Sequence, residues 1–277
     1  MKIIFPFIRI VRFGNVIMAG FAVFLGSWLS GTLRWPQVSL LMVAAMSSTG
    51  FGNVINDLRD VHSDRINHPR RPLPQNQISV PTASAFAVFL MITAIAAAAG
   101  VSFFYIAATI VPIALLCIYS LYLKSIPLAG NFLVATLVAY AFLFAALPQS
   151  QRTILIIPAT LAFLLNLCRE IVKDIQDSSG DIAQGVKTSA ILPPTVLKAV
   201  LISSAIIYLS LLFLPSVLGH FRTIYIAIAL FVIIPIHMTW IKLVLCGQLI
   251  SKTPQISNLL KIEMIAGLVA MAADKLV

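Results

Sequence analysis

Nine apolar stretches, each about 20 residues long, dominate this sequence and leave little of it for any other structure. A helix needs about 20 apolar residues to cross a hydrocarbon core that is about 30 Å thick. The mean hydropathy of +1.01 and the charged content of 10% are those of a membrane protein. We expect spans at residues 14–33, 38–56, 82–100, 102–122, 130–148, 153–172, 194–215, 222–242 and 258–276. The sequence therefore predicts an all-α membrane protein with one transmembrane domain over residues 1–277.

The carboxylates of this chain are few and clustered. Six of the nine Asp and Glu residues form two trios of identical spacing that begin 117 residues apart: Asp57, Asp60, Asp64, Asp174, Asp177 and Asp181. On an α-helix, offsets of 0, 3 and 7 residues project at about 0°, 300° and 340°, so each trio forms one negative stripe. Such a stripe repels itself unless cations bind it. A solvated helix face is the common alternative, but the apolar remainder of the chain argues against it.

Positive charges indicate how the spans are oriented, because cytoplasmic loops of membrane proteins carry an excess of Lys and Arg. With the N-terminus in the cytoplasm, 15 of the 19 Lys and Arg residues lie inside, and those outside are Arg34, Arg152, Arg222 and Lys275. We expect a multi-pass protein of the cytoplasmic membrane, with residues 1–13 forming an interfacial helix. The net charge of +10 suits anionic lipids and substrates. No nucleic-acid-binding motif accompanies it, so we expect no nucleic-acid partner.

The two aspartate trios occupy equivalent places in the predicted topology. Each lies at the cytoplasmic end of an even-numbered span, so we expect two four-helix halves of the same direction plus one added helix. If the halves pack around a central cavity, the trios converge in it. Carboxylates inside a helix bundle are costly and usually carry function. Their oxygen atoms favour Mg²⁺, which completes its coordination with water and phosphate oxygens, so the implied substrate is a diphosphate.

Polar and basic residues near the trios are candidates for substrate binding. Asn53 precedes Asp57 by four residues and shares its stripe, and Asn56 adds a second amide. The nearby basic residues either bind the diphosphate or follow from the positive-inside bias: Arg65, Arg70, Arg71, Lys124, Arg169, Lys173 and Lys187. Arg59 and His62 project from the back of the first helix, so we exclude both from the site.

Three segments carry motifs that match a known family. Residues 53–79 read as NDxxDxxxD from Asn56, followed by Asn67, Arg70 and Pro72. The segment YSLYLKSIPLAGN supplies Tyr119, Lys124, Gly130 and Asn131. The run REIVKDIQD leads into the second trio. Together these motifs resemble the UbiA-type membrane prenyltransferases, and the last run is most similar to the digeranylgeranylglyceryl phosphate synthase branch of that family.

The resemblance implies a specific architecture and chemistry. It implies nine helices around a central cavity that opens sideways to lipid, and Mg²⁺-dependent transfer of a prenyl chain from its diphosphate to a lipophilic acceptor. It also implies that all six aspartates of the trios engage the metal ions. Lys124 is expected near the diphosphate, with Arg70, Tyr119 and Asn131 as further substrate-binding residues.

The acceptor is predicted from the second motif and from a surplus of cations. A glycerol phosphate lipid needs cationic groups for a second phosphate. The number of cationic residues beside the trios exceeds the number that one diphosphate with two Mg²⁺ would require: Arg70, Arg71, Arg169, Lys173 and Lys187. We expect transfer of a geranylgeranyl group to geranylgeranylglyceryl phosphate. The alternative is an aromatic or chlorin acceptor of a quinone or chlorophyll pathway.

Two other protein classes share some of these features. A cation-coupled transporter also carries acidic residues in its membrane helices, but here the aspartates of both trios lie at one membrane face. A CDP-alcohol phosphotransferase also pairs aspartates with two metals. Its pattern needs Gly and Ala-Arg directly after the first two aspartates, whereas Asp60 is followed by Val-His-Ser in this chain. Prenyl transfer is therefore the favoured interpretation.

Overall fold

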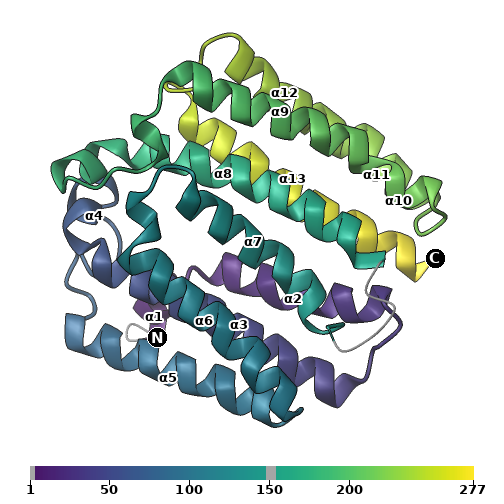
Figure 1. Cartoon of the computed structure of the whole chain (residues 1–277), viewed down its shortest axis with the longest axis horizontal. Coiled ribbons are helices and arrows are strands. Elements are labelled where there is room, and N and C mark those ends of the chain that lie inside the picture. The colour runs from purple at the N-terminus through teal and green to yellow at the C-terminus, as the bar shows by residue number, and fades with distance from the viewer. Residues whose placement is uncertain (1–3, 148–153) are drawn as a thin grey trace.

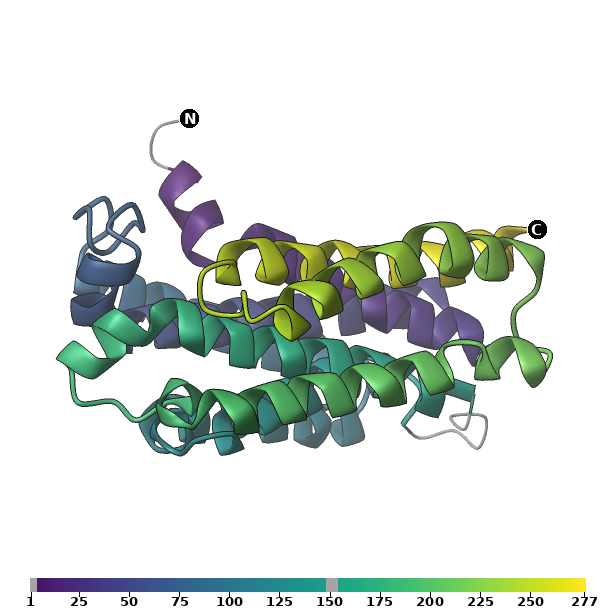
Figure 2. The same cartoon turned by 90° about the horizontal axis from the view of Figure 1, so that it is seen from above.

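The computed structural model describes residues 4–147 and 154–277, and within these ranges every regular element is helical (Figure 1). The long helices lie alongside one another in a single bundle. The short helix α4 and the last turns of α8 lie together at one end of this bundle, and the C-terminus lies at the opposite end (Figures 1 and 2).

The helices follow the predicted order of spans. The first half contains α1 (Ile4–Ile10), α2 (Phe13–Leu29), α3 (Trp35–Arg59), α4 (Val61–Asn67), α5 (Val80–Ala99) and α6 (Phe103–Leu121). The second half contains α7 (Ala129–Phe144), α8 (Ile156–Ala183), α9 (Pro194–Leu212), α10 (Leu214–Val217), α11 (Thr223–Ile228) and α12 (Ile234–Leu245), and α13 (Thr253–Leu276) is the added helix. A π-helical segment, Ala229–Ile233, joins α11 to α12.

Each predicted span has a helical counterpart, but a count of nine membrane spans is not confirmed. In the described part of the chain, six segments are long and apolar enough to cross a membrane: α3, α5, α6, α9 with α10, α11 with α12, and α13. The pair α1 and α2, bent by 62°, makes a seventh if it counts as one span. Helix α7 has only 16 residues, and α8 carries charged residues along its second half. The chain is a multi-pass membrane protein.

The apolar residues pack into three clusters, one of which joins Leu41 and Tyr105 of the first half to Phe144 of α7. Leu164, Leu201 and Trp240 belong to the large core of the second half, which also takes in α2 and α13. Phe51 and Val54 belong to a smaller core between α3 and α5. Helix α2 meets α7 at Gly26, where a Cβ atom would lie 2.0 Å from the carbonyl oxygen of Phe142. Small residues let membrane helices approach this closely, so Gly26 brings the two halves together.

A proline inside α6 shapes the interior of the bundle. Pro112 has no N–H, so the carbonyl of Ala108 loses its partner within the helix. The hydroxyl of Tyr140 on α7 donates a hydrogen bond of 2.7 Å to this carbonyl. Backbone groups in the hydrocarbon region must be satisfied internally, and Tyr140 does so while joining α6 to α7.

Candidate active site

The first aspartate trio lies on two helices, not on one continuous helix as the spacing predicted. Helix α3 ends at Arg59, and Asp60 occupies the turn before α4. The three side chains still lie close together, because helical backbone hydrogen bonds continue through the turn. The N–H of Asp60 donates to the carbonyl of Asn56, and the N–H of Asp64 donates to the carbonyl of Asp60. All three carboxylates are buried.

Each aspartate of the first trio contacts a cation. Arg12 lies 2.6 Å from Asp57. Arg71 lies 2.7 Å from both carboxylate oxygens of Asp64 and 3.3 Å from Asp57. Lys124 donates to Asp60. Burial raises the pKa of the Asp64 carboxyl, and the neighbouring Arg71 opposes that rise.

The second trio lies on α8, which continues to Ala183 and so extends beyond the predicted end of the span at residue 172. The carboxylate of Asp174 accepts hydrogen bonds from Asn131 at 2.9 Å and from the backbone N–H of Ser189 at 3.1 Å. Asp177 contacts His68 at 2.9 Å. These bonds come from three separate segments, so Asp174 and Asp177 are held by side chains and backbone far from them in the sequence.

The two trios meet in one pocket, as the topology predicted. Lys124 contacts Asp60 and also lies 3.9 Å from Asp181. Asn67 at the end of α4 donates to the carbonyl of Asp177 at 2.6 Å and accepts from the backbone N–H of Gly180 at 2.9 Å. Five aspartates line this acidic pocket: Asp60, Asp64, Asp174, Asp177 and Asp181. Asp57 joins it through Arg12 and Arg71, which line the pocket and contact its carboxylate.

The donor groups of the acidic pocket fit a magnesium ion. In the described ranges, no three Asp, Glu, His or Cys side chains lie close enough together to surround one metal ion. Arg71 and Lys124 form ion pairs with Asp64 and Asp60. The side-chain oxygens lining the pocket are nevertheless those that Mg²⁺ prefers. Asn56 adds a buried Oδ1 atom without a hydrogen-bond partner. This orphaned oxygen and the carboxylates suit a hard cation.

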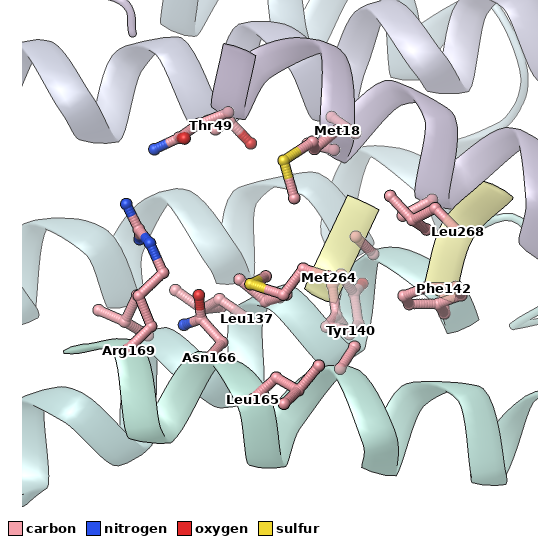
Figure 3. Close-up of a pocket in the computed structure, with 18 of the residues that line it drawn as sticks. Met18, Thr49, Leu137, Tyr140, Phe142, Leu165, Asn166, Arg169, Met264 and Leu268 are labelled. Carbon is pink, nitrogen blue, oxygen red and sulfur yellow. The ribbon is translucent and has the colours of Figure 1, made fainter. Parts of the chain in front are cut away.

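A second, larger cavity adjoins the acidic pocket and runs along the interior of the bundle. Its volume is about 250 Å³. The two cavities share five lining residues: Arg12, Asn56, Tyr119, Glu170 and Lys173. We call the larger cavity the chamber. Beyond the shared neck, its walls are mainly apolar and include Met18, Leu137, Phe142 and Leu268 (Figure 3). The combined space joins a highly charged end to an apolar channel.

The other predicted binding residues fall into two groups. Asn53 and Arg169 line the chamber, Lys124 lines the acidic pocket, and three residues line both cavities: Asn56, Tyr119 and Lys173. Asn131 lines neither cavity, and its amide donates a hydrogen bond to the carboxylate of Asp174. Arg70 and Lys187 are exposed and line neither cavity. The structure thus brings together most of the predicted set and leaves these two outside it.

Several residues of the site were not predicted. Arg12 was assigned only to the positive-inside count, yet it pairs with Asp57 and lines both cavities. His68 and Asn67 contact α8, and Ser189 supports Asp174. Arg71 was one of the basic candidates, and it reaches the first trio, whereas its neighbour Arg70 does not. The position of Arg71 shortly after the first trio indicated that it could bind there. Neither the spacing nor the motif showed that Arg71, and not Arg70, makes the contact.

Comparison with known protein families supports the interpretation of these motifs. The sequence profile of the UbiA prenyltransferase family matches residues 17–247. A digeranylgeranylglyceryl phosphate synthase of Methanoculleus marisnigri is 38% identical over 187 residues, which is 66% of each chain. An enzyme with the same name from Methanothermobacter thermautotrophicus is 32% identical over 275 residues, covering 97% of this chain and 95% of the relative.

Solved structures show the same fold. A structure described as a digeranylgeranylglyceryl phosphate synthase in membranes superposes with a TM-score of 0.76, at 24% identity, and covers 99% of both chains. A UbiA homologue from Archaeoglobus fulgidus, bound to GPP and Mg²⁺, superposes with a TM-score of 0.64, at 19% identity, over 98% of this chain and 100% of the other.

Proposed function

Because this chain belongs to the UbiA prenyltransferase family, we propose that it transfers a geranylgeranyl group from geranylgeranyl diphosphate to geranylgeranylglyceryl phosphate in an Mg²⁺-dependent reaction. An ether forms at the free glycerol hydroxyl, and diphosphate leaves. Relatives named digeranylgeranylglyceryl phosphate synthase support the acceptor, and the homologue bound to GPP and Mg²⁺ supports the donor and the metal. Family membership favours this transfer over the transporter and phosphotransferase alternatives.

One observation carries the proposal: the pocket of converging aspartates opens directly into an apolar chamber. A prenyl diphosphate has the same division into a highly charged head and a long apolar chain. We place the diphosphate in the acidic pocket together with Mg²⁺, which the six aspartates would hold, and the prenyl chain in the chamber. Residues at the neck, where the reacting carbon sits, include Tyr119 and Lys173.

The residues of the pocket then have distinct roles. When bound, Mg²⁺ supplies positive charge that stabilises the leaving diphosphate. Lys124 and Arg71 are released from their carboxylates as the ligand binds and donate to the diphosphate oxygens, where negative charge develops. Asn131 and Ser189 hold the carboxylate of Asp174 in a fixed orientation. The apolar chamber excludes water from the allylic carbon, which would otherwise be hydrolysed.

The membrane orientation completes the proposal. The protein resides in the cytoplasmic membrane with its N-terminus and both aspartate trios on the cytoplasmic side, as the Lys and Arg distribution favours. Residues 1–277 act as one domain. The arrangement of α4 and the last turns of α8 at the same end of the bundle supports a single site at one membrane face (Figure 1).

The proposal is tested by incubating the purified protein in lipid nanodiscs with geranylgeranyl diphosphate, Mg²⁺ and separate acceptors, followed by mass spectrometry. We expect the diether with geranylgeranylglyceryl phosphate, and loss of the product when EDTA removes the metal. An aromatic acid or a chlorin serves as the competing acceptor. Ready prenylation of either one, with no product from the glycerol phosphate lipid, contradicts the assigned acceptor and leaves prenyl transfer standing.

A further inference from the structure

The chamber contains a polar patch that the aspartate chemistry does not use. Asn166 lies on the chamber wall with only 3% of its surface exposed, and its Nδ2 atom has no hydrogen-bond partner. Arg169, one turn further along α8, likewise has a buried Nε atom without a partner. Figure 3 shows both side chains projecting from α8 into the cavity, opposite Thr49 and Met18. Buried polar groups are normally hydrogen-bonded, so two orphaned donors facing one cavity indicate a ligand.

Lys261 adds a positive charge to the same cavity. It lies on α13 and lines the chamber, and among the described residues it forms no ion pair or hydrogen bond. A Cβ atom on Gly14 would lie 3.6 Å from the Lys261 ammonium, so the glycine leaves space for this group beside the start of α2. The other cations of the chamber have partners: Arg12 pairs with Asp57, and both Arg169 and Lys173 pair with Glu170.

The charges around the chamber match a phosphate monoester. Its lining residues include four cations, Arg12, Arg169, Lys173 and Lys261, and one carboxylate, Glu170, which leaves a net charge of +3. The pairing of Arg12 with Asp57 reduces this to +2. A phosphate monoester carries about −1.5 to −2 at neutral pH, whereas a carboxylic acid carries only one charge. The surplus is therefore compensated by a phosphate more completely than by an aromatic carboxylate.

The spacing along α8 also fits two separate anions. Asn166 precedes Asp174 by eight residues and Arg169 precedes it by five, which correspond to about 12 Å and about 7.5 Å of helix rise. In the reacting complex, the acceptor hydroxyl lies about 3 Å from the allylic carbon, so the acceptor phosphorus lies at most about 10 Å from the nearer phosphorus of the donor. The patch is at the right depth to hold this second phosphate while the aspartates hold the first.

We propose that Asn166, Arg169 and Lys261 form a headgroup site that binds the phosphate of the acceptor lipid. The inference rests on the proposed function and adds the residues that select a phosphorylated acceptor. Asn166 and Arg169 donate hydrogen bonds to the phosphate oxygens, and Lys261 supplies the unpaired charge. The site holds the acceptor with its hydroxyl toward the neck, so it positions the nucleophile without touching the diphosphate.

Steady-state kinetics of Lys261→Met and Asn166→Leu test this site. We expect each variant to raise the KM for geranylgeranylglyceryl phosphate by about tenfold to a hundredfold, because one charge-assisted hydrogen bond is lost. The KM for geranylgeranyl diphosphate stays unchanged, and Lys261→Arg retains most of the acceptor affinity. Matched controls are Lys242→Met and Asn258→Leu, which change exposed residues outside both cavities. A rise in the donor KM, or an unchanged acceptor KM, overturns the proposal.

Equilibrium binding in nanodiscs separates this inference from the proposed function. The probes are geranylgeranylglyceryl phosphate and the same lipid without its phosphate. We expect the wild type to prefer the phosphorylated lipid by at least about tenfold, and Lys261→Met to lose that preference. If the wild type shows the preference without forming an ether, the headgroup site stands and the proposed reaction fails. Equal binding of both lipids to the wild type refutes the headgroup site, whether or not turnover occurs.

Discussion

The guanidinium of Arg12 lies 2.6 Å from the carboxylate of Asp57, and this ion pair connects the bend between α1 and α2 to the C-terminal end of α3. Arg12 has a left-handed backbone conformation with φ of 54°, which is uncommon outside glycine. It also lines both cavities at their shared neck. The bend therefore places a cation at the shared neck of the two cavities.

We expect Arg12→Ala to lower kcat by about tenfold to a hundredfold, because the variant removes a preorganised cation from the neck and weakens the support of Asp57. Arg12→Lys should recover part of the activity. Initial rates at saturating substrates measure the effect. The exposed Arg59 serves as the matched control, and Arg59→Ala should behave as wild type. Full activity of Arg12→Ala would show that Arg12 does not contribute to the site.

The paired aspartate site is tested at one position in each trio. Asp57→Ala and Asp174→Ala should each reduce turnover by at least about a thousandfold, since both halves are needed to hold the diphosphate through the metal. Both variants should still insert and elute as the wild type does in size-exclusion chromatography. His62→Ala, at an exposed position on the back of α4, is the control and should retain activity. Normal turnover in either aspartate variant contradicts a site shared by both trios.

Gly180 lies where α4 packs closely against α8. A Cβ atom there would lie 2.5 Å from Nδ2 of Asn67 and 2.7 Å from the carbonyl oxygen of Ser63. Gly180→Ala should push α4 away and separate His68 from Asp177, with a loss of activity of about tenfold or more, because small misplacements of catalytic groups are costly. Rate measurements at several Mg²⁺ concentrations report the change. Ser179→Ala, at the exposed neighbouring position, should have little effect.

The C-terminal helices enclose a polar cluster that serves stability. His237 and Glu263 are completely buried and lie 2.6 Å apart, and Trp240 donates to Glu263 at 2.9 Å. His237→Ala or Glu263→Ala should destabilise the fold by about 3–5 kcal/mol, because each leaves a buried polar partner uncompensated. Thermal unfolding in detergent measures the loss.

A double-mutant cycle separates this pairing from simple loss of packing. The variant with both His237→Leu and Glu263→Leu should be more stable than the sum of the single changes predicts, since it leaves neither partner unpaired. Strict additivity of the two changes would show that the two side chains do not interact.

The topology is tested by cysteine labelling in a variant without the native Cys117, Cys168 and Cys246. Gln75 and Gln184 are exposed positions in the loops that follow the two aspartate trios, and cysteines at both should react from the cytoplasmic side. A cysteine at His220, in the loop before α11, should react only from the opposite side. Reaction of Gln75→Cys and Gln184→Cys from different sides refutes the proposed orientation.

The sequence by itself determined the membrane class and the two aspartate trios. Both depend on local patterns, since an apolar stretch has to cross the bilayer as a helix and a spacing of three and four residues places side chains on one face. These rules do not depend on what the helix packs against. They identified the long helices from α2 to α13, but not the short helix α4, and they placed both trios at the ends of predicted spans.

Only the tertiary structure decided which residues complete the site and where the helices stop. Arg12 reaches Asp57, and His68 reaches Asp177, across long stretches of chain, so no spacing rule connects them. Asn166 lies in an apolar run, and only packing shows that its amide faces a cavity. Contacts of this kind depend on the relative rotation and approach of packed helices. Close packing at positions such as Gly26 and Gly180 sets that geometry, which hydropathy and periodicity do not encode.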